Sequence, residues 1–281
     1  MIFTLNKKIL IISLIIIALF VGCDKKNVFC IHIIDVGQGD SILIQTPSNK
    51  NMLIDGGDED SAKIIKSYLK NKRIKNLDVV VATHPDSDHI GSLDYVIDKF
   101  NVEKIYMTEQ TTDSECYDNL IDSCAKKNLK IEYLSKDDHF NLDDSTRIDI
   151  LSPSYITDNN NSNSIVMNIS YKNNDFLFTG DCEESNEIDI INSYDLENVD
   201  FLKVAHHGSS SSSSLDFLEE VTPDIAVISC GYKNSYGHPH QSTLDNLKAV
   251  DSRIFRTDIN GSMVFYSDGD KIYSKVKYKP E

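Results

Sequence analysis

The chain has 281 residues, of which 40% are hydrophobic and 26% are charged, a balance typical of a globular protein with a normal core. Its formal net charge at pH 7 is −16. A surface this acidic excludes proteins that collect polyanions by bulk electrostatics, so any nucleic acid would have to be held by a local site.

The first 22 residues have the pattern of a signal peptide. Lys7 and Lys8 precede an apolar run over residues 9–21, which is shorter than the ~20 residues that a membrane span needs. An uncleaved anchor and an ordinary secretory signal remain alternatives to a lipoprotein signal. All three place the rest of the chain outside the cytoplasm.

A small residue directly before Cys23 resembles a bacterial lipobox, although Phe20 stands where leucine is usual. We therefore predict a lipoprotein signal over residues 1–22, a lipid on Cys23 and a short polar tether over residues 23–28. Removing residues 1–22 takes away two lysines and no acids, so the charge becomes −16 − 2 = −18. The expected product is a membrane-anchored lipoprotein on the extracytoplasmic side.

The other five cysteines are scattered and odd in number, and none belongs to a C-x-x-C pair. This usage favours neither a disulfide framework nor a thiolate zinc site. Cys116 and Cys124 could pair or could be free and buried. We expect no essential disulfide.

Hydrophobic periodicity and turn residues divide the remainder into alternating elements. The patterns predict strands at residues 29–34, 41–45, 51–54, 77–82, 104–107, 130–134, 147–151, 164–171, 175–179, 200–205 and 224–229, followed by three closing strands. They predict helices at residues 59–71, 91–100, 114–127, 184–193, 215–220 and 243–250. This order suits one α/β domain over residues 29–281, a four-layer αββα sandwich with two sheets packed face to face.

Two imidazoles and two carboxylates follow the apolar strand at residues 77–82. His84, Asp86, Asp88 and His89 can converge at the carboxyl end of that strand if the last two open the next helix. Mixed imidazole and carboxylate ligation suits Zn²⁺, Mn²⁺ or Fe²⁺. The alternative is a solvated acidic turn in an acidic protein.

Two further clusters stand at predicted strand ends. Asp181 follows an apolar strand, where a carboxylate could bridge two metal ions ~3.5 to 4 Å apart. His206 and His207 follow another strand, and adjacent side chains cannot point the same way. One of these histidines would be a ligand, and the other could contact substrate or orient a ligand.

A fourth histidine, His238, lies in a loop framed by glycine and proline. It could donate a proton or bind an anionic oxygen, and the alternative is an exposed turn. The serine run at residues 209–214 can cap the following helix and is given no catalytic role.

The order H-x-D-x-D-H over residues 84–89 resembles the metallo-β-lactamase superfamily signature, with Asp86 where histidine is usual. The variant is similar to the hydrolase domain of the ComEC competence proteins and their stand-alone relatives. The resemblance covers nearly all of residues 29–276 and includes the segments 35–40, 53–57, 163–164, 179–181, 206–209 and 237–239.

The resemblance implies an αββα fold and hydrolysis by a metal-bound hydroxide, with one or two Zn²⁺ or Mn²⁺ ions. His84 and Asp86 would hold one ion, and Asp88, His89 and either His206 or His207 the other, with Asp181 bridging. Asp88 would also orient the water, and His207 and His238 complete the catalytic set. Substrate contacts are expected from Gln38, Asp40, Asn163, Ser164 and His238.

Two departures from the superfamily pattern matter. No histidine lies between His139 and His206, and Asn163 and Ser164 stand where the superfamily has a further ligand histidine. Asn163 is an indifferent ligand, so the His84 side should bind metal more weakly. The membrane channel of ComEC is not part of this sequence, so a role in DNA uptake does not follow from the resemblance.

The leading hypothesis is a metal-dependent hydrolase of phosphodiesters, similar to a ComEC nuclease. One alternative is an esterase acting on phosphorylcholine of teichoic acids at the cell surface. Another is a surface binding protein without catalysis. The expected partners are a phosphoester substrate, as nucleic acid or cell-surface polymer, and the membrane through Cys23, with no obligate protein partner evident.

Overall fold

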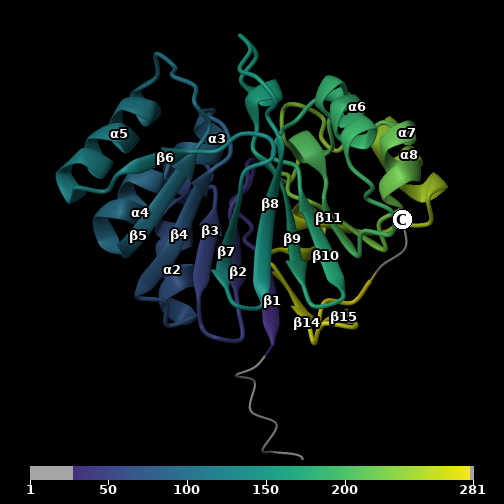
Figure 1. The fold of residues 1–281 in the computed structure, drawn as a ribbon, viewed down its shortest axis with the longest axis horizontal. Helices are drawn as coiled ribbons and strands as arrows, with labels where there is room; N and C mark the ends of the chain where they lie inside the picture. Colours follow the sequence, from purple (N-terminus) through teal and green to yellow (C-terminus); the bar gives the residue numbers. More distant parts are fainter. Residues whose placement is uncertain (1–27, 279–281) are drawn as a thin grey trace, which may run out of the picture.

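The computed structural model describes residues 28–278 as two β-sheets packed face to face, with helices on both outer surfaces (Figure 1). The predicted signal peptide, Cys23 and most of the tether lie outside the described residues. No helix within residues 28–278 combines the length and the apolar character needed to cross a membrane.

The first sheet has eight strands, six from the N-terminal half of the chain and two, β14 and β15, from its C-terminal end. Its order across the sheet is β15 (Ile272–Ser274), β14 (Met263–Ser267), β1 (Phe29–Ile33), β2 (Ile42–Gln45), β3 (Asn51–Ile54), β4 (Asn76–Ala82), β5 (Asn101–Met107) and β6 (Ile131–Tyr133). Strands β1, β2 and β3 form the expected antiparallel meander, and β3 to β6 run parallel to one another. The strands β1, β3, β4, β5 and β6 therefore all end at the same edge.

The second sheet has seven strands. Its order is β13 (Arg253–Arg256), β12 (Ile225–Ile228), β11 (Phe201–Lys203), β10 (Asn174–Phe178), β9 (Val166–Tyr171), β8 (Thr146–Ser152) and β7 (His139–Asp143). Strands β10 to β13 are parallel, so their carboxyl ends also share one edge.

Three apolar clusters fill the three interfaces of the four layers. The inner faces of both sheets contribute to the central cluster, which includes the fully buried Phe176 and Phe201. One outer cluster joins the first sheet to helices on the left of Figure 1, namely α2 (Ala62–Asn71), α3 (Ser87–Ile90), α4 (Leu93–Lys99) and α5 (Glu115–Lys127). The other joins the second sheet to α6 (Glu184–Ser193), α7 (Leu215–Val221) and α8 (Gln241–Ala249). The described residues therefore contain a complete core, and the expected αββα sandwich is confirmed.

Some boundaries differ from the predicted ones. The helix expected at residues 91–100 is α4, which begins at Leu93. A separate short helix, α3, precedes it, and another short helix, α9 (Thr257–Asn260), follows β13. Strand β7 was not predicted, although its residues alternate between polar and apolar side chains; it is a short edge strand in which only Leu142 is buried. Cys116 and Cys124, which could have paired, are both free on α5.

Candidate metal centre

The carboxyl ends of β4, β10 and β11 deliver three groups of side chains to one place. His84 follows β4, Asp181 follows β10, and His206 and His207 follow β11. Backbone hydrogen bonds connect these ends: the amide of His206 donates to Gly180 O at 3.1 Å, and the amide of Ile165, just before β9, donates to Thr83 O at 2.9 Å. The clusters that the sequence predicted separately are therefore one site.

Helix α3 supplies Asp88 and His89, as expected for residues that open a helix after β4. The loop of residues 35–40 packs directly against this helix. A Cβ atom on Gly39 would collide with the carbonyl of Asp88, so the approach requires glycine at that position. The amide of Asp40 also donates to the carbonyl of Asp88 at 3.2 Å.

His89 is fully buried at the middle of the site. Its Nδ1 donates to Asp55 Oδ2 at 2.8 Å. Its Nε2 therefore points the other way, where it lies 3.2 Å from Asp181 Oδ1 and 3.4 Å from His207 Nε2. A carboxylate that holds the far nitrogen of an imidazole is the usual support of a metal-ligating histidine.

His207 is held in the same manner, because its Nδ1 donates to the carbonyl of Ser229 at 3.0 Å. Its Nε2 lies 3.3 Å from both Asp88 Oδ2 and Asp181 Oδ2. His206 remains partly exposed, with its Nε2 3.8 Å from Asp181 Oδ2. The structure thus directs His207 into the cluster and leaves His206 at its margin.

The turn that carries these two histidines is strained. His206 and His207 have φ values of 48° and 56°, in the left-handed region that non-glycine residues seldom adopt. Such conformations cost about 1 to 3 kcal/mol each and persist where the surrounding structure imposes them. A Cβ atom on the next residue, Gly208, would lie 2.6 Å from Pro239 Cβ, so the turn is clamped against the loop that contains His238.

The His84 side of the site is supported by hydroxyl groups instead of a carboxylate or a carbonyl. His84 Nδ1 lies 3.2 Å from Thr83 Oγ1 and 3.3 Å from Ser164 Oγ, so its Nε2 faces Asp86 Oδ2 at 3.7 Å. The Asp86 side chain is 37% exposed and accepts a hydrogen bond from the side-chain amide of Asn160. This side has fewer metal-ligand side chains than the His89 side.

The acidic residues of the site attract protons to its histidines. Burial alone would lower the pKa of His207, but the charge of Asp181 and the hydrogen bonds with Asp181 and Asp88 raise it to about 9. His89 also has a raised pKa, because Asp181 and Asp55 outweigh the effect of burial. In return, the pKa of Asp181 lies well below its usual range despite burial, owing to His207 and His89. A site that stabilises positive charge this way favours a metal cation, which must displace these protons to bind.

The residues fit a divalent metal. Ligand atoms of His84, His89 and Asp181 lie within 4.8 Å of one another, and so do those of Asp88, His89 and His207. Among the described residues, buried His84 Nε2 has no hydrogen-bond partner, and buried Asp181 Oδ1 has only its ion-pair contact with His89 Nε2. An unpaired buried polar atom is costly, and a bound cation would satisfy both.

The expected substrate contacts are placed differently. Asp40 is 1% exposed and forms a buried ion pair of 2.6 Å with Lys203, beneath the metal centre. The fully buried side chain of Asn163 accepts from the Thr157 amide and donates to its carbonyl, both at 2.8 Å. Both side chains are therefore buried and bonded to neighbouring protein groups, and the Asp40 carboxylate also lies 3.7 Å from His207 Nδ1.

Two further predicted contacts also serve the framework of the site. Buried Ser164 Oγ accepts a hydrogen bond from the Asp181 amide at 3.1 Å and lies beside His84. Gln38 Oε1 accepts from the Gly231 amide at 3.2 Å, which joins the loop of residues 35–40 to the loop after β12.

His238 lies at the rim of the centre. Its ring centroid lies 5.6 Å from that of His206 and 6.2 Å from that of His207. Asn234 fixes the loop, accepting from the His238 amide at 2.9 Å and donating to its carbonyl at 2.6 Å. Burial, together with the charges of His207, His206 and His240, lowers the pKa of His238 to about 4.

Sequence reasoning did not identify the supporting residues Asp55 and Lys203. Asp55 was noted only within a glycine-containing segment, yet it binds Thr83 as well as His89. Lys203 ends the apolar strand β11 and is fully buried, with its Nζ donating to Val204 O at 2.9 Å. A lysine at the end of an apolar strand that leads into a histidine pair is the one signal that could have indicated it.

Comparison with known proteins gives the family. The profile of the Metallo-beta-lactamase superfamily matches residues 34–232. ComE operon protein 3 of Bacillus subtilis is 29% identical over 253 residues, which is 84% of this chain and 32% of that protein. Recombination protein 2 of Haemophilus influenzae is 30% identical over 272 residues, 91% of this chain and 31% of that protein. The chain thus spans about a third of the length of these relatives.

Solved structures agree on the fold. The metallo-beta-lactamase fold protein YhfI of Bacillus subtilis superposes with a TM-score of 0.54 at 16% identity, over 81% of this chain and 96% of YhfI. Zn²⁺-bound PqqB of Methylobacterium extorquens superposes with a TM-score of 0.52 at 11% identity, over 81% of this chain and 87% of PqqB. The diiron β-hydroxylase CmlA of Streptomyces venezuelae superposes with a TM-score of 0.54 at 12% identity, over 82% of this chain and 53% of CmlA. Members of this fold therefore use divalent metals, as the His and Asp clusters here indicate. The chain belongs to the metallo-beta-lactamase superfamily of metal-dependent hydrolases, and its sequence relatives are ComEC-like proteins.

Proposed function

We propose that this protein hydrolyses phosphodiesters on the extracytoplasmic side of the membrane, with Zn²⁺ or Mn²⁺ bound at the described centre. The observation that carries the proposal is the position of Asp181. Its Oδ1 lies 3.2 Å from His89 Nε2 and its Oδ2 lies 3.3 Å from His207 Nε2, while His84 closes the other side. One carboxylate can thus serve two ions, as two-metal hydrolytic sites require.

Asp88 and His238 each have a definite part in this chemistry. The bound ions would lower the pKa of water and polarise a phosphoryl oxygen. The side chain of Asp88 is 32% exposed, so it can accept a hydrogen bond from the attacking water at the mouth of the site. The lowered pKa of His238 keeps its ring neutral at pH 7, so it offers an N–H to a phosphate oxygen rather than a positive charge.

The proposal is tested with residues 24–281, stripped of metal and reconstituted with Mn²⁺ or Zn²⁺. Turnover of bis-p-nitrophenyl phosphate should return with metal and fall roughly 10³-fold in Asp181→Ala, because several kcal/mol of charge stabilisation is lost. Asp216→Ala is the matched control, since Asp216 is exposed in the first turn of α7. Metal binding without turnover on any phosphodiester would favour the binding-protein alternative.

Substrate and location are tested separately. Single-stranded DNA and p-nitrophenyl phosphorylcholine distinguish a nuclease from an esterase of cell-surface polymers, and the charge of −18 favours the smaller or tethered substrate. The lipid on Cys23 predicts that Cys23→Ser releases the protein from membranes without changing specific activity. Unchanged membrane retention would argue against the lipid.

A further inference from the structure

A basic hollow lies far from the metal centre, where α2 and α4 end. It encloses about 490 Å³ and has no carboxylate among its lining residues, which are Lys70, Arg73, Ile74, Lys75, Lys99 and Phe100. Ile74 and Phe100 are 7% and 8% exposed and form an apolar floor beneath the four cations. On a chain with a net charge of −16, this is a local reversal of sign.

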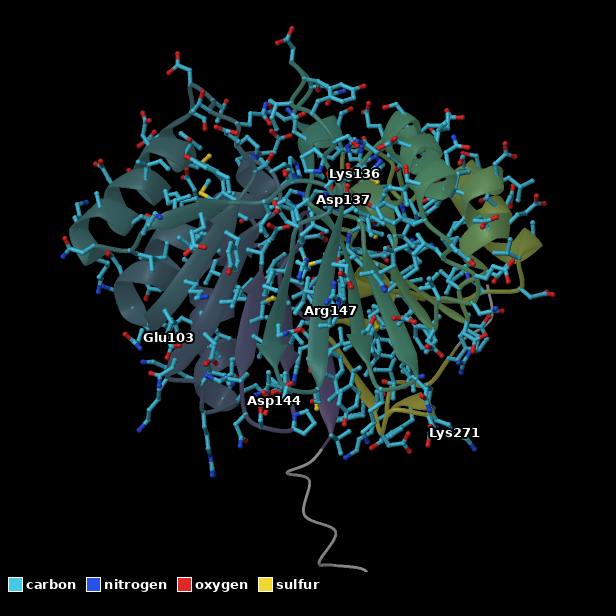
Figure 2. The ribbon with its side chains drawn as sticks, in the orientation of Figure 1. Glu103, Lys136, Asp137, Asp144, Arg147 and Lys271 are labelled. Atoms are coloured by element: carbon cyan, nitrogen blue, oxygen red, sulfur yellow. The ribbon has the colours of Figure 1, made fainter. Side chains whose placement is uncertain are left out.

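A second hollow of about 550 Å³ adjoins the first and shares Arg73, Ile74 and Lys75 with it. It adds the cations Lys50 and Lys72 and the acids Asp78 and Glu103. Asp78 is already paired with Lys50 at 2.5 Å, and Glu103 is labelled at the lower left of Figure 2. We call this surface the basic end, defined as Lys50, Lys70, Lys72, Arg73, Lys75 and Lys99.

Helix dipoles account for only part of this cluster. Lys70 and Lys99 stand in the last turns of α2 and α4, where a cation is stabilised by the helix carboxyl terminus. Arg73 and Lys75 lie beyond α2, in the exposed loop before β4. Among residues 28–278, no carboxylate lies within ion-pair distance of Lys70, Arg73 or Lys75. These charges therefore have no local structural requirement.

The basic end lies at the edge of the sheet where β1 begins. Cys30 pairs with Gln45, Gln45 pairs with Asn51, and the Asn51 amide donates to Asp78 at 2.8 Å. The last three of these residues line the second hollow. Since neighbouring strands are ~4.8 Å apart, the start of β1 is ~10 to 15 Å from that hollow. In Figure 1 this is the lower end of the molecule, where β1 begins.

The metal centre is at the opposite edge of the same sheet. His84 follows the carboxyl end of β4, and the seven residues of β4 span ~23 Å. The segment before β1, which carries Cys23, therefore joins the fold at the same end of the molecule as this basic cluster, far from the site.

We propose that the basic end docks on an anionic membrane surface, with lipid phosphate groups over Lys70, Arg73, Lys75 and Lys99 and the metal centre facing away. The proposal rests on the extracytoplasmic, membrane-anchored location proposed above and does not depend on hydrolysis. Each lysine or arginine near an anionic bilayer strengthens binding about fivefold. Asp78, Glu103 and Asp143 lie close enough to act on Lys50, whereas acidic groups farther away than the ~10 Å Debye length at 0.1 M salt are largely screened. The apolar floor favours a lipid over a nucleic acid, whose backbone offers no apolar group to cover it.

Residues 24–281, which carry the complete core but no lipid, allow docking to be measured on its own. The protein is sedimented with phosphatidylcholine vesicles that contain or lack phosphatidylglycerol. It should bind only the vesicles with phosphatidylglycerol, and K70Q/R73Q/K75Q should bind at least about tenfold more weakly. The matched control K63Q/K248Q/K277Q removes the same charge from residues that line neither hollow, and it should bind like the unchanged protein. Thermal unfolding of each variant checks that the fold is intact.

Three results would overturn the proposal: equal binding to vesicles without phosphatidylglycerol, an equal loss in the control variant, or displacement of the vesicles by single-stranded DNA bound at the same residues. The triple variant should keep full turnover of bis-p-nitrophenyl phosphate in solution. Vesicle binding without turnover in the unchanged protein would leave docking standing and reject the hydrolase. Turnover without selective vesicle binding would reject docking and leave the proposed hydrolysis standing.

Discussion

The two halves of the metal centre share Asp181 but differ in how firmly the protein orients their ligand side chains. On the His89 side, the far nitrogens of His89 and His207 each donate to a fixed acceptor, Asp55 and the Ser229 carbonyl. On the other side, His84 is flanked by two hydroxyl groups, and the carboxylate of Asp86 is 37% exposed.

This difference indicates one firm site and one weaker site. A ligand side chain that is already oriented loses less conformational entropy when the metal binds. The His89 side should therefore hold its ion more tightly. The sequence predicted the same asymmetry from Asn163, and the structure gives a stronger reason, because the Asn163 amide is committed to Thr157.

The largest change in metal affinity should come from Asp55→Asn. Replacing this carboxylate weakens the support of His89 and should reduce metal affinity about 10- to 100-fold, with turnover restored by excess metal. A competition titration against a chromophoric chelator measures the affinity. If the affinity is unchanged, the hydrogen bond between Asp55 and His89 does not distinguish the two halves.

A smaller effect, on stability alone, is expected for Asn163→Ala. Loss of a buried amide that bonds the Thr157 backbone should reduce the free energy of unfolding by about 1 to 3 kcal/mol, as measured by urea denaturation. Metal affinity should stay within about twofold, because the amide faces away from the ions. A large loss of affinity with unchanged stability would make Asn163 a ligand and remove the asymmetry.

Much of the fold could be predicted because its strands are apolar or alternate regularly. The periodicity located the strands that bring His84 and Asp181 to the site. It missed β7, where the five residues from His139 to Asp143 alternate between polar and apolar side chains, so the signal for this short edge strand was present in the sequence.

The site could be predicted as a list of residues but not as a geometry. The sequence named His84, Asp88, His89 and Asp181, yet it could not choose between His206 and His207. That choice depends on two left-handed residues in one turn, a feature that has no signature in composition. The Asp40 and Lys203 pair was missed for a related reason, because a single lysine in a strand gives no sign of the acid that it will meet.

The most direct test of two unequal halves around Asp181 is a calorimetric titration of metal-free residues 24–281 with Zn²⁺, alongside His84→Ala and His207→Ala. We predict two binding steps of unequal affinity, with the weaker step lost in His84→Ala and the tighter step lost in His207→Ala. Two equivalent sites, or loss of the tighter step in His84→Ala, would contradict this account.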